Sequence, residues 1–220
     1  MDEYKVIDVK NWIRRIQYER FSTFSNPTYG FCVRIDVTDV VKFSKETRSS
    51  FFANFLYVIT RVHNECEELR LRVLESGEVV LFDQIDPDFT VKTEDHCFNN
   101  AGFTYTRDYK TFYKLCRETV DANSKCMNTN REYNTKKYNC FYCSCLTSID
   151  ILSMVHPIKN GDEVSSSVPR IFWDKYIEED EKYYLNLNFT VSHALVDGED
   201  LSKAFNLVRE YCKDFKKIIE

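Results

Sequence analysis

The segment from residue 183 to residue 191 alternates apolar and polar side chains almost without exception. Successive side chains of an extended chain point to opposite faces, so the apolar ones share one side of a strand. These are Tyr183, Leu185, Leu187, Phe189 and Val191. Residues 201–219 instead repeat apolar residues at helical spacing. A strand followed closely by an amphipathic helix favours folds in which helices pack on a sheet.

The other periodic segments predict more strands and helices in alternation. We expect strands over 31–37 and 89–92, a hairpin of 69–74 with 79–82, helices over 45–66 and 109–120, and a polar connection over 121–137. The hairpin contains Gly77, which can adopt the positive φ of a tight turn. The pattern predicts an α/β two-layer sandwich, a mixed β-sheet with helices packed on it.

Composition limits the classes of protein that this chain can belong to. Its 220 residues are 43% hydrophobic and 30% charged, and no repeat or linker divides them, so we expect one domain over 1–220. The formal charge of −5 argues against nucleic acid as a partner. We find no apolar run of membrane-spanning length and no signal-peptide order at the start, and we expect a cytoplasmic protein without a membrane partner.

The chain has nine cysteines, an odd number, and reduced thiols are expected in a cytoplasmic protein. Cys140, Cys143 and Cys145 form the one cluster with some likeness to a metal site. A structural zinc site needs four ligands in paired spacings, and the cluster has three. We therefore predict no metal, and interpret the cluster as a strand in which small cysteines pack.

His193 lies between the predicted final strand and the final helix, and Asp197 follows it. A neutral imidazole can take a proton from a hydroxyl or a thiol and return it, which makes histidine the commonest general base. A histidine at a strand end can also be an ordinary surface or core residue. Taken alone, the residue leaves both interpretations open.

The motif His193-Ala-Leu-Val-Asp197-Gly198 resembles the core of the chloramphenicol acetyltransferase family, which belongs to the coenzyme A acyltransferase superfamily. Three further segments resemble the family in the same order, namely residues 8–15, 82–91 and 169–176. Residues 8–15 contain the pattern Asp-x-x-x-Trp-x-Arg. The likeness therefore extends over nearly the whole chain.

The resemblance implies a homotrimer with active sites between subunits, in which acetyl-CoA is a co-substrate and no cofactor is permanently bound. His193 would deprotonate a hydroxyl of a small-molecule acceptor, and the hydroxyl oxygen would attack the thioester directly. In the family a serine hydroxyl stabilises the negative oxygen of the tetrahedral intermediate. Ser144 is the best match, a competing alignment places Asn139 there, and a strand serine without a role is the third possibility.

The resemblance also assigns supporting roles. Asp197 would form an ion pair with Arg14 that shapes the turn after His193, and Gly198 completes the motif; the alternative for Arg14 is a solvated helix charge. Lys175 and Tyr176 match residues near coenzyme A, although Lys175 can equally be an ordinary surface lysine. The candidate acceptor residues are Phe21, Tyr29, Phe103 and Phe172.

Several positions depart from antibiotic-modifying members of the family. Ser192 replaces the first of two histidines, Phe21 replaces a tyrosine, and Phe172 replaces a threonine that binds the acceptor. Thr147 and Ser148 stand in place of a Pro-Trp pair. These changes remove hydrogen-bonding groups near the acceptor and leave the acyl-transfer residues in place.

Three functions remain in competition. The first is an O-acetyltransferase acting on chloramphenicol, with antibiotic resistance as its role, or on another hydroxylated small molecule. The second is a non-catalytic or substrate-diverged trimeric homologue that binds a small molecule. The third is a thiol hydrolase using Cys143 or Cys145 with His193, although the sequence has no nucleophile elbow.

Overall fold

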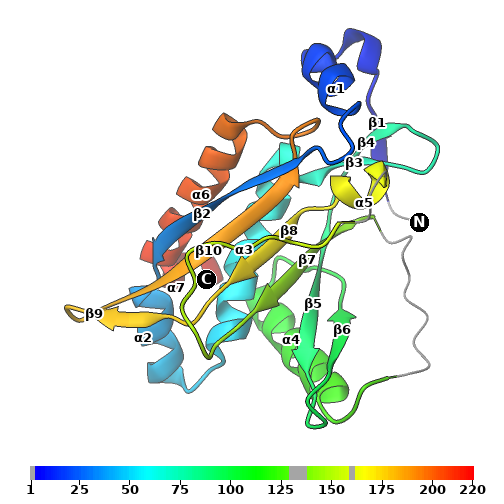
Figure 1. Cartoon of the computed structure of the whole chain (residues 1–220). Coiled ribbons are helices and arrows are strands. Elements are labelled where there is room, and N and C mark those ends of the chain that lie inside the picture. The colour runs from blue at the N-terminus through cyan, green and yellow to red at the C-terminus, as the bar shows by residue number, and fades with distance from the viewer. Residues whose placement is uncertain (1–2, 129–137, 159–161) are drawn as a thin grey trace.

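The computed structural model describes residues 3–128, 138–158 and 162–220. Two sheets and a layer of helices build the described part (Figure 1). The larger sheet has the strand order β2-β10-β8-β7-β5-β6, and β9 pairs with β10. Its strands are β2 (Thr28–Asp36), β5 (Asp86–Lys92), β6 (Phe98–Gly102), β7 (Cys140–Cys145), β8 (Arg170–Trp173), β9 (Ile177–Glu179) and β10 (Lys182–Ser192).

The larger sheet is mixed, as predicted. β5, β7 and β8 run parallel to one another, and the other pairings are antiparallel. A smaller antiparallel sheet has the order β1-β4-β3. Its strands are β1 (Tyr4–Val6), β3 (Leu71–Val73) and β4 (Val79–Phe82).

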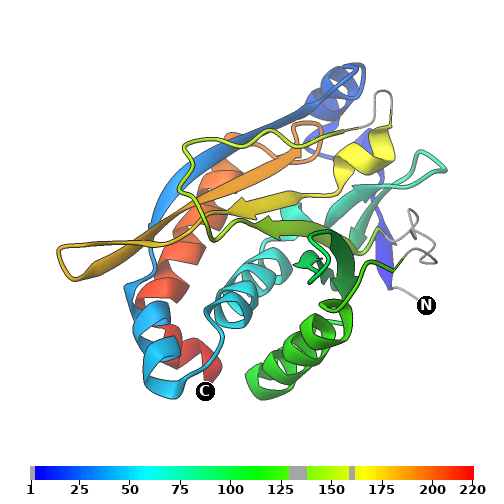
Figure 2. The ribbon, with the colours of Figure 1, turned by 60° about the horizontal axis from the view of Figure 1, so that its bottom comes forward.

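The longer helices pack together on one face of the larger sheet (Figure 2). The α-helices are α1 (Arg15–Phe21), α2 (Thr38–Thr47), α3 (Phe51–Glu65), α4 (Tyr109–Asn123), α5 (Glu163–Ser167), α6 (Gly198–Lys213) and α7 (Phe215–Ile219). Two 3-10 helices, η1 (Val9–Asn11) and η2 (Glu67–Arg70), complete the helical elements. Residues 146–158, which follow β7, cross the opposite face of the sheet, which we call the open face (Figure 2).

The core lies between the sheet and α3, whose residues 53–63 are all buried. Ser50 caps the start of α3 by accepting a hydrogen bond from the backbone nitrogen of Ala53 at 3.4 Å. Apolar residues of β10 face this helix layer, including Leu187 and Phe189, both 0% exposed. Because side chains alternate along a strand, the polar residues of β10 lie on the open face of the sheet.

The structure confirms the strand over 183–191, the strand over 89–92 as part of β5, and the hairpin with Gly77 at φ +82°. The strand over 31–37 is displaced, since β2 covers Thr28–Asp36. The helix over 109–120 is α4, which continues to Asn123 into the predicted connection. The rest of that connection is not regular structure as far as residue 128, and residues 129–137 lie outside the described residues.

Two helix predictions were wrong in their extent. The helix over 45–66 is two helices, because Arg48 adopts φ 53° and ends α2 before α3 begins. The helix over 201–219 also divides, into α6 and α7, since Asp214 leaves the helical conformation with φ −135°. The apolar stripe of 201–219 continues across its break, and that of 45–66 lies wholly within α3, so periodicity alone reveals neither break.

Candidate active site

His193 occupies the turn between β10 and α6, and its imidazole lies between two aromatic rings. The ring of Phe21 stacks on one face, with centroids 4.0 Å apart and an interplanar angle of 10°. The ring of Tyr29 covers the other face at 4.3 Å and 29°. The backbone nitrogen of His193 donates to the carbonyl of Pro27 at 2.9 Å. Substrate can therefore approach this imidazole only at its edge.

The two nitrogens of that edge are not equivalent. Nδ1 of His193 is buried without a hydrogen-bond partner among the described residues and lies 3.5 Å from Oδ1 of Asp197. The side chain as a whole is 33% exposed. A proton on Nδ1 would point toward a negative charge, which leaves Nε2 with the lone pair that a base needs.

Arg14 holds Asp197 in this position. Its Nη1 and Nη2 both donate to the carboxylate of Asp197, the second at 3.1 Å, and Nη1 also lies 3.5 Å from Oδ2 of Asp200. The side chain of Arg14 is 13% exposed and that of Asp197 is 35% exposed. The ion pair implied by the resemblance is thus present and partly buried, at the start of α6.

Tyr29 is bound to the same turn. Its hydroxyl donates to the backbone carbonyl of Val196 at 3.2 Å. Burial, followed by the negative charge of Asp197, raises the pKa of Tyr29 to about 12. The hydroxyl therefore stays protonated at neutral pH and remains a donor to the turn that carries His193.

Ser144 lies on the open face of β7, away from His193. Its Oγ is 2.8 Å from the Oγ1 of Thr90 on β5. The strand register pairs Ser144 with Phe172, and Phe172 with Asn188 of β10. From Asn188 to His193 the chain spans roughly 16 Å, at about 3.3 Å per residue. One subunit therefore does not bring Ser144 and His193 together.

Lys175 and Tyr176 follow β8 and line a cavity of about 330 Å³. Phe51 and Phe52, at the start of α3, form part of its wall. The ring of Tyr176 contacts that of Phe51 edge-on at 4.9 Å. Cys145 of β7 also lines the cavity, which therefore lies on the helix side of the sheet, opposite to the face that carries Ser144.

Phe103 and Asn139 lie elsewhere. Phe103 packs against Phe112 of α4 with ring centroids 5.0 Å apart, and so lies in the helix layer of its own subunit. Asn139 stands at the start of β7, where its backbone carbonyl accepts from Asp86 at 2.7 Å. The predicted residues therefore form two groups in one subunit, one around His193 and one around Ser144. Phe103 and Asn139 belong to neither group.

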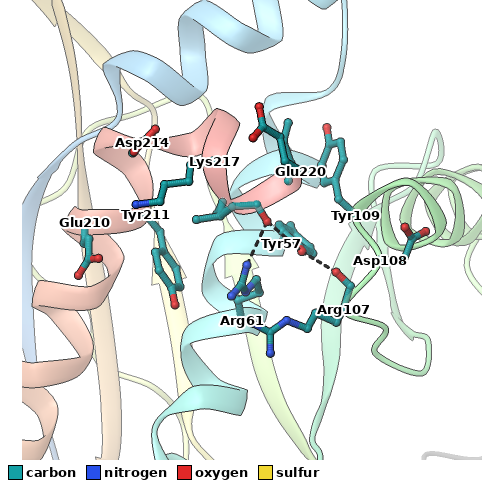
Figure 3. Close-up of a pocket in the computed structure, with 12 residues that line it drawn as sticks. Tyr57, Arg61, Arg107, Asp108, Tyr109, Glu210, Tyr211, Asp214, Lys217 and Glu220 are labelled. Carbon is teal, nitrogen blue, oxygen red and sulfur yellow. Dashed lines mark hydrogen bonds between the residues drawn. The ribbon is translucent and has the colours of Figure 1, made fainter.

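A larger pocket of about 580 Å³ opens between α3, the start of α4 and the α6–α7 break (Figure 3). Figure 3 shows that two of its polar groups have partners within the pocket: Nη1 of Arg61 donates to the carbonyl of Ile218 at 3.0 Å, and the hydroxyl of Tyr57 donates to the carbonyl of Arg107 at 2.7 Å. The pocket contains no residue predicted for the site. We assign it no role in the chemistry.

The cysteines of β7 are poor nucleophiles where they lie. Burial raises the pKa of Cys143 well above its usual value and that of Cys145 to about 11. The reactive form of a cysteine is the thiolate, which burial disfavours. Across the described residues, no three His, Cys, Asp or Glu side chains gather as metal ligands would. None of the described helices is long and apolar enough to cross a bilayer.

Two polar residues of the open face were not singled out from the sequence. Asn188 was placed opposite the core by the alternation of β10, but nothing in that pattern suggested a contact. His156, in the segment that crosses the open face, lies with its Nε2 3.1 Å from Oδ1 of Asn188. That segment has no periodicity, so no sequence signal could have located the contact.

This fold is that of an acyltransferase. A solved dihydrolipoamide acetyltransferase of Azotobacter vinelandii shares it, with a TM-score of 0.66 and 15% identity over 93% of this chain and 88% of that chain. A solved chloramphenicol acetyltransferase is more similar, with a TM-score of 0.88 and 25% identity over 96% of this chain and 100% of that chain.

Residues 2–209 match the chloramphenicol acetyltransferase family, and the chain belongs to it. A chloramphenicol acetyltransferase of Escherichia coli is 26% identical over 216 residues, 97% of this chain and 95% of that protein. One of Campylobacter coli is 27% identical over 198 residues, 89% of this chain and 92% of that protein. The resemblance found in the sequence is confirmed, and the chain is an acetyltransferase of this type.

Proposed function

We propose that this chain transfers the acetyl group of acetyl-CoA to a hydroxyl of a small molecule, with Nε2 of His193 as the general base. The observation that carries the proposal is the aromatic enclosure of His193 by Phe21 and Tyr29. It fixes the plane of the ring and exposes one edge. A base held in this way meets the geometric demand of proton transfer, which contributes about 10²–10⁴-fold to a rate.

The reaction would run through a complex of both substrates with the enzyme. Nε2 takes the proton of the hydroxyl while its oxygen attacks the thioester carbonyl. The tetrahedral intermediate then collapses, the carbon–sulfur bond breaks, and the imidazolium returns the proton to the departing thiolate of coenzyme A. No acyl-enzyme and no metal enters this sequence.

Ser144 would donate a hydrogen bond to the negative oxygen of the intermediate. Its contact with Thr90 supports this role, because Thr90 can donate to Oγ of Ser144 and leave the serine proton available. An oxyanion donor of this kind contributes about 3–4 kcal/mol to the transition state. Asn139 is the alternative donor.

The separation of Ser144 from His193 supports active sites between subunits, and a homotrimer is the assembly that the family resemblance implies. If one subunit supplies His193 and its neighbour supplies Ser144, the two groups around these residues become one site. Apolar residues stand exposed on the segment that crosses the open face, with Leu152 at 90% and Val155 at 88%. Exposed apolar groups of this kind are typical of protein interfaces.

The cavity beside Lys175 and Tyr176 is proposed for the pantetheine arm of coenzyme A. Half of its lining residues are aromatic, and it lies at the end of β7, the strand that carries Ser144. Lys175 is exposed at its edge and can meet a phosphate. We place the reaction in the cytoplasm, where nine free cysteines would stay reduced. The formal charge of −5 argues against nucleic acid as a partner.

Chloramphenicol is the first acceptor to test, and resistance to it is the role proposed if it is acetylated. The assay follows the release of free coenzyme A thiol from acetyl-CoA with chloramphenicol and with a panel of other hydroxylated compounds. Release that His193→Ala abolishes supports the proposal. If the native chain releases no thiol with any compound of the panel, the result would instead favour a homologue that only binds its ligand.

A further inference from the structure

The resemblance groups Tyr29 with the acceptor residues, but both ends of its side chain already have contacts within the chain. Its ring lies on the imidazole of His193, with centroids 4.3 Å apart. Its hydroxyl donates its one proton to the backbone carbonyl of Val196 at 3.2 Å. The hydroxyl therefore has no proton left for an acceptor molecule, and what it holds is the turn that carries His193.

The peptide group between Val196 and Asp197 is held at both of its polar atoms. Its carbonyl oxygen accepts from Tyr29, and its nitrogen, which belongs to Asp197, donates to Oδ2 of Asp200 at 3.0 Å. Val196 is 3% exposed, so without the hydroxyl its carbonyl would lose a partner away from water. A buried carbonyl without a partner is costly, and the bond to Tyr29 therefore stabilises this orientation of the peptide.

The orientation of this peptide sets where the carboxylate of Asp197 lies. Oδ1 of Asp197 is 3.5 Å from Nδ1 of His193 and accepts a hydrogen bond from Nη2 of Arg14 at 3.1 Å. Arg14 thus fixes the outer end of the side chain, whereas the peptide fixes the backbone from which it starts. Rotation of the peptide would change the separation of Oδ1 from Nδ1, and with it the preference for a proton on Nδ1.

We propose that Tyr29 is a positioning residue, whose hydroxyl holds Asp197 beside Nδ1 so that Nε2 of His193 keeps the lone pair of the base. This inference rests on the proposed function, and it gives Tyr29 a role in acetyl transfer instead of a role in binding the acceptor. The ring and the hydroxyl act together, since the ring limits the tilt of the imidazole and the hydroxyl fixes the turn from which both His193 and Asp197 extend.

Tyr29→Phe tests the hydroxyl alone, because it keeps the ring on His193 and removes only the oxygen. We expect kcat for thiol release from acetyl-CoA with chloramphenicol to fall by about 5-fold, the value of one neutral hydrogen bond, while the KM of chloramphenicol stays native. A residue that binds the acceptor predicts the opposite pattern, a raised KM at native kcat. That pattern, or native values of both constants, would overturn the proposal.

Tyr57→Phe is the matched control. The hydroxyl of Tyr57 also donates to a backbone carbonyl, that of Arg107 at 2.7 Å, but it lies in the helix layer beside the large pocket. Both variants should melt at a lower temperature than the native protein, and only Tyr29→Phe should lower kcat. An equal loss of kcat in the two variants would mean that the hydroxyl of Tyr29 contributes only to stability, contrary to the proposal.

The protonation of the imidazole is a second readout, which needs no turnover. Nitrogen-15 NMR of protein labelled in its four histidine rings shows which nitrogen carries the proton, and His193→Ala identifies the signals of His193. At about pH 8, where imidazole groups are neutral, the native ring should carry its proton on Nδ1. Tyr29→Phe should add signals of the tautomer protonated on Nε2, and Tyr57→Phe should not. A native ring protonated on Nε2, or His193 signals that Tyr29→Phe leaves unchanged, would contradict the proposal.

The two readouts separate this inference from the proposed function. If the native chain releases no thiol with chloramphenicol or the rest of the panel, the mechanism is removed, and the NMR spectra alone decide whether Tyr29 positions the ring. If thiol release depends on His193 but is as fast in Tyr29→Phe as in the native chain, acetyl transfer is retained and the positioning role is removed.

Discussion

The imidazole of His193 and the ring of Phe21 lie nearly parallel, with centroids 4.0 Å apart and an angle of 10° between their planes. These residues are far apart in sequence, and the stack joins the end of α1 to the turn after β10. It restricts rotation of the imidazole while leaving the Nε2 edge open. The N-terminal segment is therefore part of the candidate active site, although it lies at the edge of the fold.

Replacing Phe21 by Leu should free the imidazole and slow catalysis. An aromatic pair contributes about 0.5–1.5 kcal/mol beyond its area, so we expect kcat to fall by about 3- to 10-fold while the KM for acetyl-CoA is unchanged. Steady-state kinetics measure both. Phe98→Leu, at a phenylalanine that is 54% exposed on β6, is the matched control and should have native kinetics. A Phe21→Leu enzyme with native kcat would show that the stack does not position the base.

Arg14 and its neighbour Arg15 provide a matched comparison of two ion pairs. Arg14→Gln leaves the carboxylate of Asp197 without its partner in a partly buried site, and we expect a loss of about 1–3 kcal/mol in the free energy of unfolding together with a fall in kcat. Arg15→Gln breaks an exposed pair with Glu19, whose side chain is 59% exposed, and should change stability by less than about 1 kcal/mol. Urea unfolding and kinetics distinguish the two. Equal changes in stability and kcat for the two variants would mean that the Arg14–Asp197 pair does not hold the turn that carries His193.

Local patterns in the sequence were enough for some of the strands and for one turn, whereas β1, β6, β8 and β9 were not predicted. β10 was predicted because its alternation reflects one buried face, and Gly77 because a tight turn needs positive φ. The break after α2 was missed because Arg48 adopts a left-handed conformation that glycine usually signals. α2 itself was missed because only Val40, Val41 and Ser44 of it are buried, which is a weak periodic signal.

Residues of the candidate site were predictable only where they belong to a motif of the family. His193, Asp197 and Arg14 came from the family resemblance, and the Arg14–Asp197 pair is present in the structure. The stack of Phe21 on His193 depends on how α1 folds back over the turn, which no local pattern encodes. Phe103 was grouped with the acceptor residues, yet in its own subunit it packs in the helix layer against Phe112.

Ser144 and Asn139 can be separated by single substitutions. If the hydroxyl of Ser144 donates to the oxyanion, Ser144→Ala should lower kcat by about 10²–10³-fold, with the KM of both substrates nearly unchanged. Asn139→Ala should then leave kcat within a few-fold of native. Thermal melting of both variants checks that the fold is retained. The reverse order of effects would move the oxyanion role to Asn139.

His63 predicts how the stability of the fold depends on pH. The residue is fully buried on α3, and its ring stacks on that of Phe141 with centroids 4.3 Å apart. Burial, reinforced by the positive charge of Arg72, lowers the pKa of His63 to about 3. In the unfolded chain a histidine titrates near its ordinary value of about 6.5.

Because the folded pKa of His63 is the lower one, the unfolded state binds its proton first as the pH falls. The native state should therefore lose about 1.4 kcal/mol per pH unit from about pH 6.5 down to about pH 3, and little from this group above pH 7. Urea unfolding at several pH values measures the slope, with His63→Leu as the comparison, since all other titrating groups then cancel in the difference. Between pH 6.5 and pH 5 the native protein should lose about 2 kcal/mol more than the variant. Parallel curves for the two proteins would mean that His63 takes up its proton in the folded state, and that the contact between α3 and β7 opens in mild acid.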